Sequence, residues 1–319
     1  MDFAGSKTID VVGVGNALVD VLVQVDDDFL TTEDLTKGKM HLVPQDAAER
    51  YLSLIANKEM TIAAGGASAN TTKGVGHLGG SAAFIGVVSG DQYGKEFQKA
   101  LEEESVSPEL VIAEGLTGNA ITYITPDGER TFTVHLGVAS LLTPAHIDEE
   151  IIKKAKVVHL EAFQFEAGTK DMLDHVIALA KQHGTLVSLD LNDASLIERN
   201  FDLFHQVLKE DIDIVFANES ESLAFTKEAD EHKAAQILGE HVQIAVVKRG
   251  EAGSVIAEGE TITEVPAAPT EVVDTTGAGD MYAAGFLQGL TGGMDLAAAG
   301  HQGATLASRV IARVGTELG

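Results

Sequence analysis

A glycine-rich motif spans residues 274–280 and reads Asp274-Thr275-Thr276-Gly277-Ala278-Gly279-Asp280. The mostly apolar residues 281–290 follow it and predict a helix. A glycine-rich turn that leads into a helix leaves the first backbone N–H groups of that helix without partners. Together with the positive end of the helix dipole, these groups form an anion site, and phosphate is the usual anion. The motif therefore predicts a phosphate-binding turn at a helix N-terminus.

Asp280 needs a separate explanation, because its carboxylate would repel the phosphate that the turn binds. Its position is explained if it removes a proton from a hydroxyl group that attacks the phosphate. The alternative is that Asp280 is a helix N-cap after a flexible turn, since aspartate is a preferred N-cap residue. The motif alone does not decide between these two roles.

Composition limits the class of protein and its location. The chain has 319 residues, of which 45% are hydrophobic and 22% are charged, as is usual for a globular protein with a large core. Residues 1–10 lack a basic segment followed by an apolar stretch, and no cysteine is present. We therefore expect no signal peptide, no disulfide and a cytoplasmic location. No run approaches the roughly 18 apolar residues of a membrane span, so we expect no membrane partner.

The formal net charge of −27 restricts the binding partners. A strongly acidic surface repels the phosphate backbone of nucleic acids, so we expect no nucleic-acid partner. The same surface repels a phosphorylated ligand at long range. A phosphate site must therefore be local, built from backbone N–H groups, a helix terminus, Mg²⁺ and one or two cationic side chains.

Alternation of strands and helices predicts the fold class. Residues 9–15 form a β-branched run that ends in glycines, which indicates a buried strand that meets a turn. Later in the chain, apolar strands alternate with helices, which predicts a mostly parallel sheet covered on both faces. The predicted strands are 157–160, 186–191, 212–216 and 244–248, and the predicted helices lie near 169–183, 201–209, 220–225 and 232–238.

A small second unit is predicted from two excursions. The segments 120–125 and 130–135 form a β-hairpin around Pro126-Asp127-Gly128-Glu129, which has good turn chemistry. Residues 26–43 are interpreted as a strand pair or a loop. We predict a large α/β domain made of residues 1–15, 44–116 and 137–319, and a small β lid made of residues 16–43 and 117–136.

Polar residues stand at the carboxyl ends of the predicted parallel strands, where open α/β sheets bind ligands. Asn218 and Glu219 suit a Mg²⁺ ion held partly through water. They also suit a helix cap and a favourable charge in the first helical turn. The turn from Lys248 to Gly253 can contact a nucleotide or can simply be a hairpin turn. The strand-end residues are Asn16, Asp190, Asn192, Asn218, Glu219, Lys248, Arg249 and Asp280.

Other nucleotide-binding and hydrolase motifs are incomplete or missing from the sequence. Gly13-x-Gly15 lacks the third glycine of a dinucleotide fingerprint, and a strand pattern follows it where the fingerprint needs a helix. The sequence has no Walker-type loop and no Gly-x-Ser-x-Gly elbow. The P-loop, dinucleotide-binding and serine-hydrolase interpretations therefore lose their main support.

With these motifs in order, the chain resembles the ribokinase-like (PfkB) family of carbohydrate and nucleoside kinases over nearly its whole length. The signatures are Gly65-Gly66 with Asn70, Asn218-Glu219, Lys248-Arg249-Gly250 and the motif at 274–280. The resemblance implies a three-layer α/β/α sandwich with a mostly parallel central sheet and a small β-sheet lid. It also implies ATP, Mg²⁺ and a small-molecule acceptor, in a monomer or a homodimer.

The resemblance assigns roles to individual residues. Asp280 is the implied catalytic base, and Gly277, Ala278 and Gly279 form the anion hole. Glu219 belongs to the magnesium network with Asn218. Asp274, Thr276 and Gly315 are implied in a monovalent-cation site, for which K⁺ is the candidate. The implied ATP-binding residues are Asn192, Asn218, Lys248, Gly250, Gly253 and Thr275.

The amino-terminal third is most similar to the adenosine kinase branch, through residues 15–20 and the lid hairpin at 125–130. By that resemblance Asp20 and Asn70 bind the ribose hydroxyls. Phe163 is expected either to stack on a purine or to pack in the core. Arg130 of the hairpin is either a cation for the phosphate or a solvated turn residue. The implied acceptor-binding residues are Asn16, Asp20, Gly65, Gly66, Asn70 and Phe163.

The favoured activity is ATP-dependent phosphorylation of a primary hydroxyl, the 5′-hydroxyl of adenosine or a related purine nucleoside. The alternative within the family is a kinase for ribose, fructose or a keto-sugar. Thr276 favours that alternative, because asparagine is usual at this position in adenosine kinases. A nucleotide-binding protein without activity is the alternative from another class, and the presence of Asp280 beside the turn argues against it.

Overall fold

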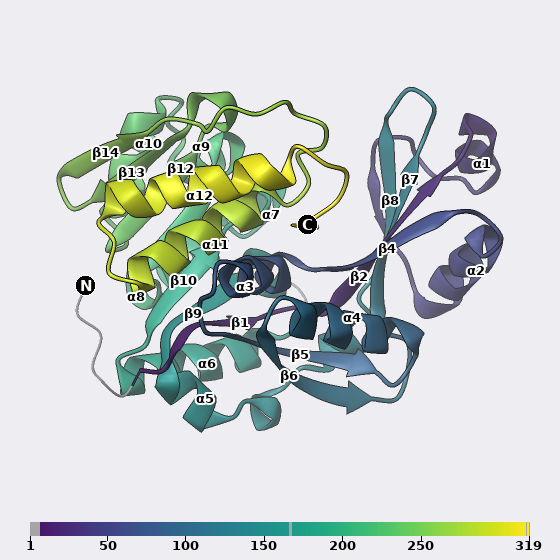
Figure 1. The fold of residues 1–319 in the computed structure, drawn as a ribbon, viewed down its shortest axis with the longest axis horizontal. Coiled ribbons are helices and arrows are strands. Elements are labelled where there is room, and N and C mark those ends of the chain that lie inside the picture. The colour runs from purple at the N-terminus through teal and green to yellow at the C-terminus, as the bar shows by residue number, and fades with distance from the viewer. Residues whose placement is uncertain (1–6, 166–167, 317, 319) are drawn as a thin grey trace.

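The large sheet joins nine strands in the order β14-β13-β12-β11-β10-β9-β1-β5-β6 (Figure 1). This computed structural model describes residues 7–165, 168–316 and 318. The strands from β12 to β6 run parallel, and β13 and β14 pair antiparallel at one edge. The bounds are β1 (Ile9–Val14), β5 (Ala82–Ser89), β6 (Val106–Ala113), β9 (Ala155–Glu161), β10 (Leu186–Asp190), β11 (Ile214–Asn218), β12 (Ile244–Lys248), β13 (Ser254–Glu258) and β14 (Thr261–Val265).

Both faces of the large sheet are buried, because successive side chains of each strand enter opposite cores. In β11, Ile214 and Phe216 belong to one core, and Val215 and Ala217 belong to the other. The first core is covered by α3 (Ala67–His77), α4 (Gln92–Glu103), α11 (Ala278–Thr291) and α12 (Leu296–Val310). The second is covered by α5 (Glu149–Lys154), α6 (Lys170–His183), α7 (Ala194–Arg199), α8 (Phe201–Asp211), α9 (Glu219–Thr226) and α10 (Glu231–Gly239).

A small sheet of five strands stands beside the large one in the order β3-β8-β7-β2-β4 (Figure 1). Val19, Val21 and Val23 of β2 are buried on one face, together with Tyr51 and Tyr123. The helices α1 (Asp27–Thr32) and α2 (Gln45–Ile55) contribute to this packing. The strands are β2 (Leu18–Gln24), β3 (Met40–Leu42), β4 (Met60–Gly65), β7 (Gly118–Ile124) and β8 (Arg130–His135).

The predicted α/β architecture, with its mostly parallel sheet and its small β sheet, is confirmed. Each predicted strand and helix between residues 144 and 250 is found, and the hairpin is β7 and β8. Within the described residues, none of the helices has both the length and the apolar character needed to cross a membrane.

One strand of the small sheet comes from outside the two segments predicted for the small lid. Strand β4 lies in the segment 44–116 that was assigned to the large domain, yet it pairs antiparallel with β2 along the small sheet. The physical reason is that β7 pairs with only one edge of β2 and leaves the other edge open. The N–H and C=O groups on an open strand edge need partners, and β4 supplies them.

Residues 26–43 also differ from the predicted strand pair or loop, because they contain helix α1 before strand β3. The Asp26 side chain caps α1 by accepting a hydrogen bond of 2.8 Å from the backbone N–H of Phe29. Asp27 and Asp28 stand in the first turn, where negative charge is favourable. Strand β6 and helices α5 and α7 were likewise not predicted.

The contact between α11 and α12 provides a test of the packing. A methyl group at Gly285 would lie 2.7 Å from the Cα atom of Gly303, a backbone atom that cannot move aside. Helix propensity alone favours alanine over glycine by about 1 kcal/mol. Overpacking outweighs this gain, so Gly285→Ala is expected to lower the free energy of unfolding by about 1–3 kcal/mol, measured by denaturant titration.

The matched control for this variant is Gly90→Ala, where the nearest atom to an added Cβ lies 3.8 Å away. This control is expected to leave the stability nearly unchanged. Equal stability of the two variants would show that the α11–α12 contact is not the tight one that the structure describes.

Candidate active site

The glycine-rich motif forms the start of α11, and its N-cap is Gly277 rather than Asp280. Gly277 has a left-handed backbone with φ of 73°, and a Cβ atom there would lie 2.8 Å from the Thr316 Cγ2 atom. Glycine meets both conditions. Among the described residues no side chain caps this end of α11. The N-cap alternative for Asp280 is therefore wrong, and the helix end is left to backbone groups.

Asp280 faces α3 from the first turn of α11. Its Oδ2 atom accepts a hydrogen bond of 2.9 Å from Nδ2 of Asn70, a buried residue of α3. Removal from water raises the pKa of Asp280 to about 7, and the hydrogen bond from Asn70 only partly offsets this effect. The nearby carboxylate of Asp190 raises the pKa further. Asp280 is thus a carboxylate that can exchange a proton near neutral pH.

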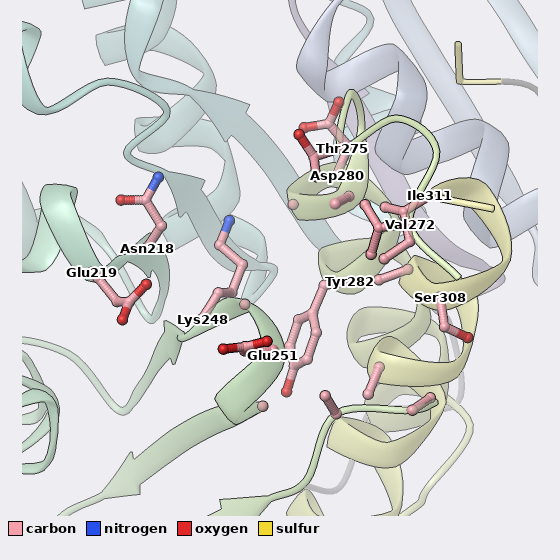
Figure 2. A pocket seen from close by; sticks show the side chains of 18 of the residues that line it. Asn218, Glu219, Lys248, Glu251, Val272, Thr275, Asp280, Tyr282, Ser308 and Ile311 are labelled. Atoms are coloured by element: carbon pink, nitrogen blue, oxygen red, sulfur yellow. The ribbon is translucent and has the colours of Figure 1, made fainter. Parts of the chain in front are cut away.

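A cavity of about 860 Å³ opens beside this turn, between the strand ends of the large sheet and helices α11 and α12 (Figure 2). Figure 2 shows Asn218 and Lys248 on one side, facing Val272 and Ile311 on the other. One wall is therefore polar and the opposite wall is largely apolar. The predicted residues that line the cavity are Asn192, Asn218, Glu219, Lys248, Gly250, Gly253, Thr275, Ala278, Gly279 and Asp280.

Lys248 places a cation next to the turn. Its Nζ atom lies 2.8 Å from Oδ2 of Asp190, and both side chains are largely buried. A Cβ atom on Gly279 would lie only 3.0 Å from the same Nζ atom. Burial alone lowers the pKa of Lys248, but the carboxylates of Asp190 and Glu221 more than reverse this and raise it. The lysine therefore stays charged beside the glycine-rich turn.

Asn218 caps α9, as the structural alternative for this residue predicted. Its Oδ1 atom accepts from the N–H of Glu221 at 2.9 Å, and the Glu221 carboxylate accepts from the Asn218 N–H and Nδ2 at 2.8 and 2.7 Å. Glu221 is buried, which raises its pKa to about 7 despite the nearby charge of Lys248. Glu221 was not among the predicted residues, although the Asn-x-x-Glu spacing of a capping box indicates it.

The predicted acceptor-binding residues gather around the start of α3. Asn16 donates to Oε1 of Glu161 through its backbone N–H at 3.0 Å and its Nδ2 at 2.7 Å. Ser68 of α3 donates to the other oxygen of the same carboxylate. Glu161 is buried, which raises its pKa. No local pattern marked Glu161, because its partners are distant in the sequence.

The Gly65-Gly66 pair lets two polar residues approach the backbone. A Cβ on Gly65 would lie 2.3 Å from Oδ2 of Asp20, and one on Gly66 would lie 2.4 Å from the backbone oxygen of Asn16. Gly66 also has φ of 91°. Burial raises the pKa of Asp20 to about 6, and the charge of Lys73 partly offsets this. The two glycines thus bring Asp20 and Asn16 to the entrance of α3.

Phe163 lies two residues beyond Glu161, the last residue of β9. It lies in a short 3-10 turn over Ala162–Phe165, is 41% exposed and belongs to neither hydrophobic core. The core-packing alternative for this residue is therefore wrong. It does not line the cavity beside the glycine-rich turn. Stacking on a purine stays a prediction.

Asp274, Thr276 and Gly315 lie together, as predicted. Oδ1 of Asp274 accepts from the Thr276 N–H at 2.9 Å and from the Thr276 hydroxyl at 2.7 Å, and Oδ2 accepts from the Gly315 N–H at 2.8 Å. Arg130 of β8 adds a hydrogen bond of 2.7 Å to Oδ1. Burial alone would raise the pKa of Asp274, but these donors hold it well below its usual range.

The described residues provide no cluster of three or more His, Cys, Asp or Glu side chains for a metal ion. Magnesium keeps much of its water and is often bound through substrate phosphates with one or two carboxylates. Glu219, which lines the cavity, fits that mode, whereas Asn218 and Glu221 are hydrogen-bonded to each other.

Comparison with known proteins identifies the family. The model of the pfkB family carbohydrate kinases matches residues 38–319. The chain belongs to this family, and it is a phosphotransferase that uses an alcohol group as acceptor.

Individual relatives carry different substrate names. The structure of adenosine kinase from Sinorhizobium meliloti superposes with a TM-score of 0.87 at 34% identity, covering 97% of this chain and 95% of that one. A probable sugar kinase protein from Rhizobium etli CFN 42 gives 0.88 at 34% identity with the same coverage. The 5-dehydro-2-deoxygluconokinase of Geobacillus thermodenitrificans is 29% identical, covering 77% of this chain and 78% of that protein.

The Lys248–Asp190 pair gives a test of the site's electrostatics. Lys248→Met leaves the Asp190 carboxylate buried without its cation, and is expected to lower the free energy of unfolding by about 3–5 kcal/mol. Adding Asp190→Leu to this variant is expected to recover much of the loss. The control is Lys170→Met, which breaks an exposed pair with Asp174 and should cost less than about 0.5 kcal/mol. Equal losses in the two single variants would contradict the burial of the pair.

Proposed function

We propose that the protein is an ATP-dependent kinase that phosphorylates the 5′-hydroxyl of adenosine or a related purine nucleoside. The observation that carries this proposal is the position of Asp280. It stands in the first turn of α11, beside the phosphate-binding turn, and is hydrogen-bonded to Asn70, one of the residues predicted to bind the acceptor. A base between a phosphate site and a hydroxyl site is what phosphoryl transfer to an alcohol requires.

In the proposed reaction the Asp280 carboxylate takes the proton of the acceptor hydroxyl as its oxygen attacks the γ-phosphorus of ATP. The bond between the γ-phosphorus and the bridging oxygen breaks, and ADP leaves with that oxygen. A pKa of about 7 suits this role, because a general base works best when its pKa is near the working pH.

The negative charge of the transferred group is balanced by groups on the other side of the turn. Lys248 lies beside Gly279, and the uncapped end of α11 offers backbone N–H groups and the positive end of its dipole. Mg²⁺, when bound with ATP, neutralises phosphate charge. Val272 and Ile311 provide an apolar wall on which the adenine of ATP can rest.

The residues proposed to bind the acceptor favour a neutral molecule with several hydroxyl groups. The Oδ1 atoms of Asn16 and Asn70 are buried and find no hydrogen-bond partner among the described residues, while their Nδ2 atoms donate to Glu161 and Asp280. With the Asp20 carboxylate they form a set of hydrogen-bond acceptors. Hydroxyl groups of a ribose can donate to such a set. An acidic sugar would be repelled by these carboxylates.

The second candidate is a sugar kinase, and one observation favours it. Phe163, the aromatic side chain expected to stack on a purine, is 41% exposed and is not held in place by either hydrophobic core. A free sugar needs no such platform. The names of the relatives also include sugar kinases.

One prediction concerns Asp280 as the catalytic base. Asp280 is protonated below its pKa, so kcat/KM is expected to rise with pH and to level off above about 7. Asp280→Asn is expected to lower kcat by about a hundred- to ten-thousand-fold. Because burial opposes ionisation of Asp280, the variant should melt no lower than wild type at pH 8. Steady-state kinetics and thermal melting measure these effects.

The matched control is Asp202→Asn, the same substitution in the first turn of α8 at an exposed position. It is expected to keep the wild-type rate and pH profile. A near-normal kcat in Asp280→Asn would refute the assignment of the base.

Another prediction concerns the identity of the acceptor. A coupled assay of ADP release across adenosine, inosine, ribose, fructose and 5-dehydro-2-deoxygluconate is expected to give the highest kcat/KM with adenosine. Asp20→Asn is expected to raise the KM of the acceptor by roughly ten- to a hundred-fold while the KM of ATP stays the same, because a hydrogen bond to a charged group is lost. Turnover with free sugars alone would instead establish the second candidate.

A further inference from the structure

Arg130 joins the small sheet to the loop that precedes the phosphate-binding turn. From its place in β8, its Nη1 atom donates to Oδ1 of Asp274 at 2.7 Å and to Oγ1 of Thr276 at 2.6 Å. The Asp274 side chain is 1% exposed, whereas the Arg130 side chain is 27% exposed. Thr276 directly precedes Gly277, the N-cap of α11. The guanidinium therefore lies one residue away from the turn.

Asp274 holds this loop in place. Its carboxylate accepts hydrogen bonds from the backbone and hydroxyl of Thr276 and from the distant N–H of Gly315. A buried carboxylate with this many neutral donors still needs a cation, because an uncompensated charge away from water is costly. In the described part of the chain, the ion pair found for Asp274 is the one with Arg130.

The resemblance to the family implied a monovalent metal ion at Asp274, Thr276 and Gly315, and the arrangement of donors does not fit one. A metal ion needs oxygen lone pairs that face it. Here Gly315 presents its N–H to the carboxylate, and Thr276 presents both its N–H and its hydroxyl. The hydroxyl oxygen of Thr276 also accepts from Arg130. The carboxylate that would neutralise a metal ion here thus already has several donors, one of which is a cation.

Arg130 also lies next to the residues proposed to bind the acceptor. A second cavity, of about 90 Å³, lies between the small sheet and the loops near residues 276 and 315. Asp20, Arg130, Thr276 and Gly315 all line it. One guanidinium therefore faces both the residue proposed to hold the acceptor hydroxyls and the loop that sets the phosphate-binding turn.

We propose that Arg130 is the built-in cation of the Asp274 loop and a positioning residue for phosphoryl transfer, so that the protein requires no monovalent metal ion. Because the cation is carried by the small sheet, it reaches the loop only when that sheet lies over it. The loop therefore takes its ordered form together with closure of the small sheet. The kinetic part of this inference rests on the proposed kinase function.

The kinetic test compares Arg130→Ala with a matched control, Lys37→Ala. Lys37 is a cation near the small sheet that pairs with exposed Asp27 and Asp127 and touches neither the loop nor the cavities. Arg130→Ala is expected to lower kcat by roughly ten- to a hundred-fold, the usual range for a lost hydrogen bond to a charged group, with a smaller change in the KM of ATP. Millimolar guanidinium chloride should restore part of this kcat, and Arg130→Lys should retain more activity than Arg130→Ala. The control should show neither the loss nor the recovery.

A wild-type kcat in Arg130→Ala would overturn the inference. So would a loss that guanidinium does not recover and that is accompanied by a large fall in melting temperature, since Arg130 would then only support the small sheet.

A second test needs no acceptor. The melting temperature of the wild-type protein is expected to be the same in KCl and in tetramethylammonium chloride at equal ionic strength. A rise that is specific to K⁺ would overturn the inference. Because this measurement does not depend on turnover, it separates failure of the cation assignment from failure of the proposed kinase function. If the assay finds no phosphorylated acceptor, the melting curves still decide whether the Asp274 loop binds K⁺.

Discussion

The hydrogen bond between Asn70 and Asp280 is the contact on which the site depends. It joins α3 and α11, whose residues are 210 positions apart, and both helices begin at a glycine with a left-handed backbone. Gly74 lets the helices approach, since an added Cβ would lie 2.5 Å from the Cβ of Ala284. Two positive helix ends therefore meet at one carboxylate. This convergence brings the proposed phosphate site and the proposed acceptor site together at one carboxylate.

The acidic charge of the chain makes local geometry decisive. Surface charges more than about 8 Å from the site are largely screened at physiological ionic strength. They therefore weaken the long-range attraction of a phosphate group without controlling its binding at the site. The cations that matter are held by buried carboxylates, Lys248 by Asp190 and Arg130 by Asp274. Because each cation is already paired, phosphate affinity depends on backbone groups and on how the side chains are arranged. Burial in turn keeps the pKa of Asp280 near neutrality.

The large sheet could be predicted because its strands are continuous apolar runs, and burial on both faces leaves that signature. Strands β4 and β6 could not, since pairing at a sheet edge is decided by which neighbour is available. The motifs indicated Lys248 because it ends strand β12, and Asp280 because it follows the glycine-rich turn into α11. The apolar wall of the cavity, which includes Val272 and Ile311, has no such motif. Glu161 was missed because its partners Asn16 and Ser68 are 145 and 93 positions away. No local pattern records such contacts.

The connections between the two sheets have a mechanical consequence. Asn16 lies between β1 of the large sheet and β2 of the small one, and Gly66 lies between β4 and α3. Both connections thus contain or touch the residues that surround the acceptor site. A rotation of the small sheet as a rigid body must bend the chain at these points. The residues proposed to bind the acceptor therefore lie at the connections about which such a rotation would turn.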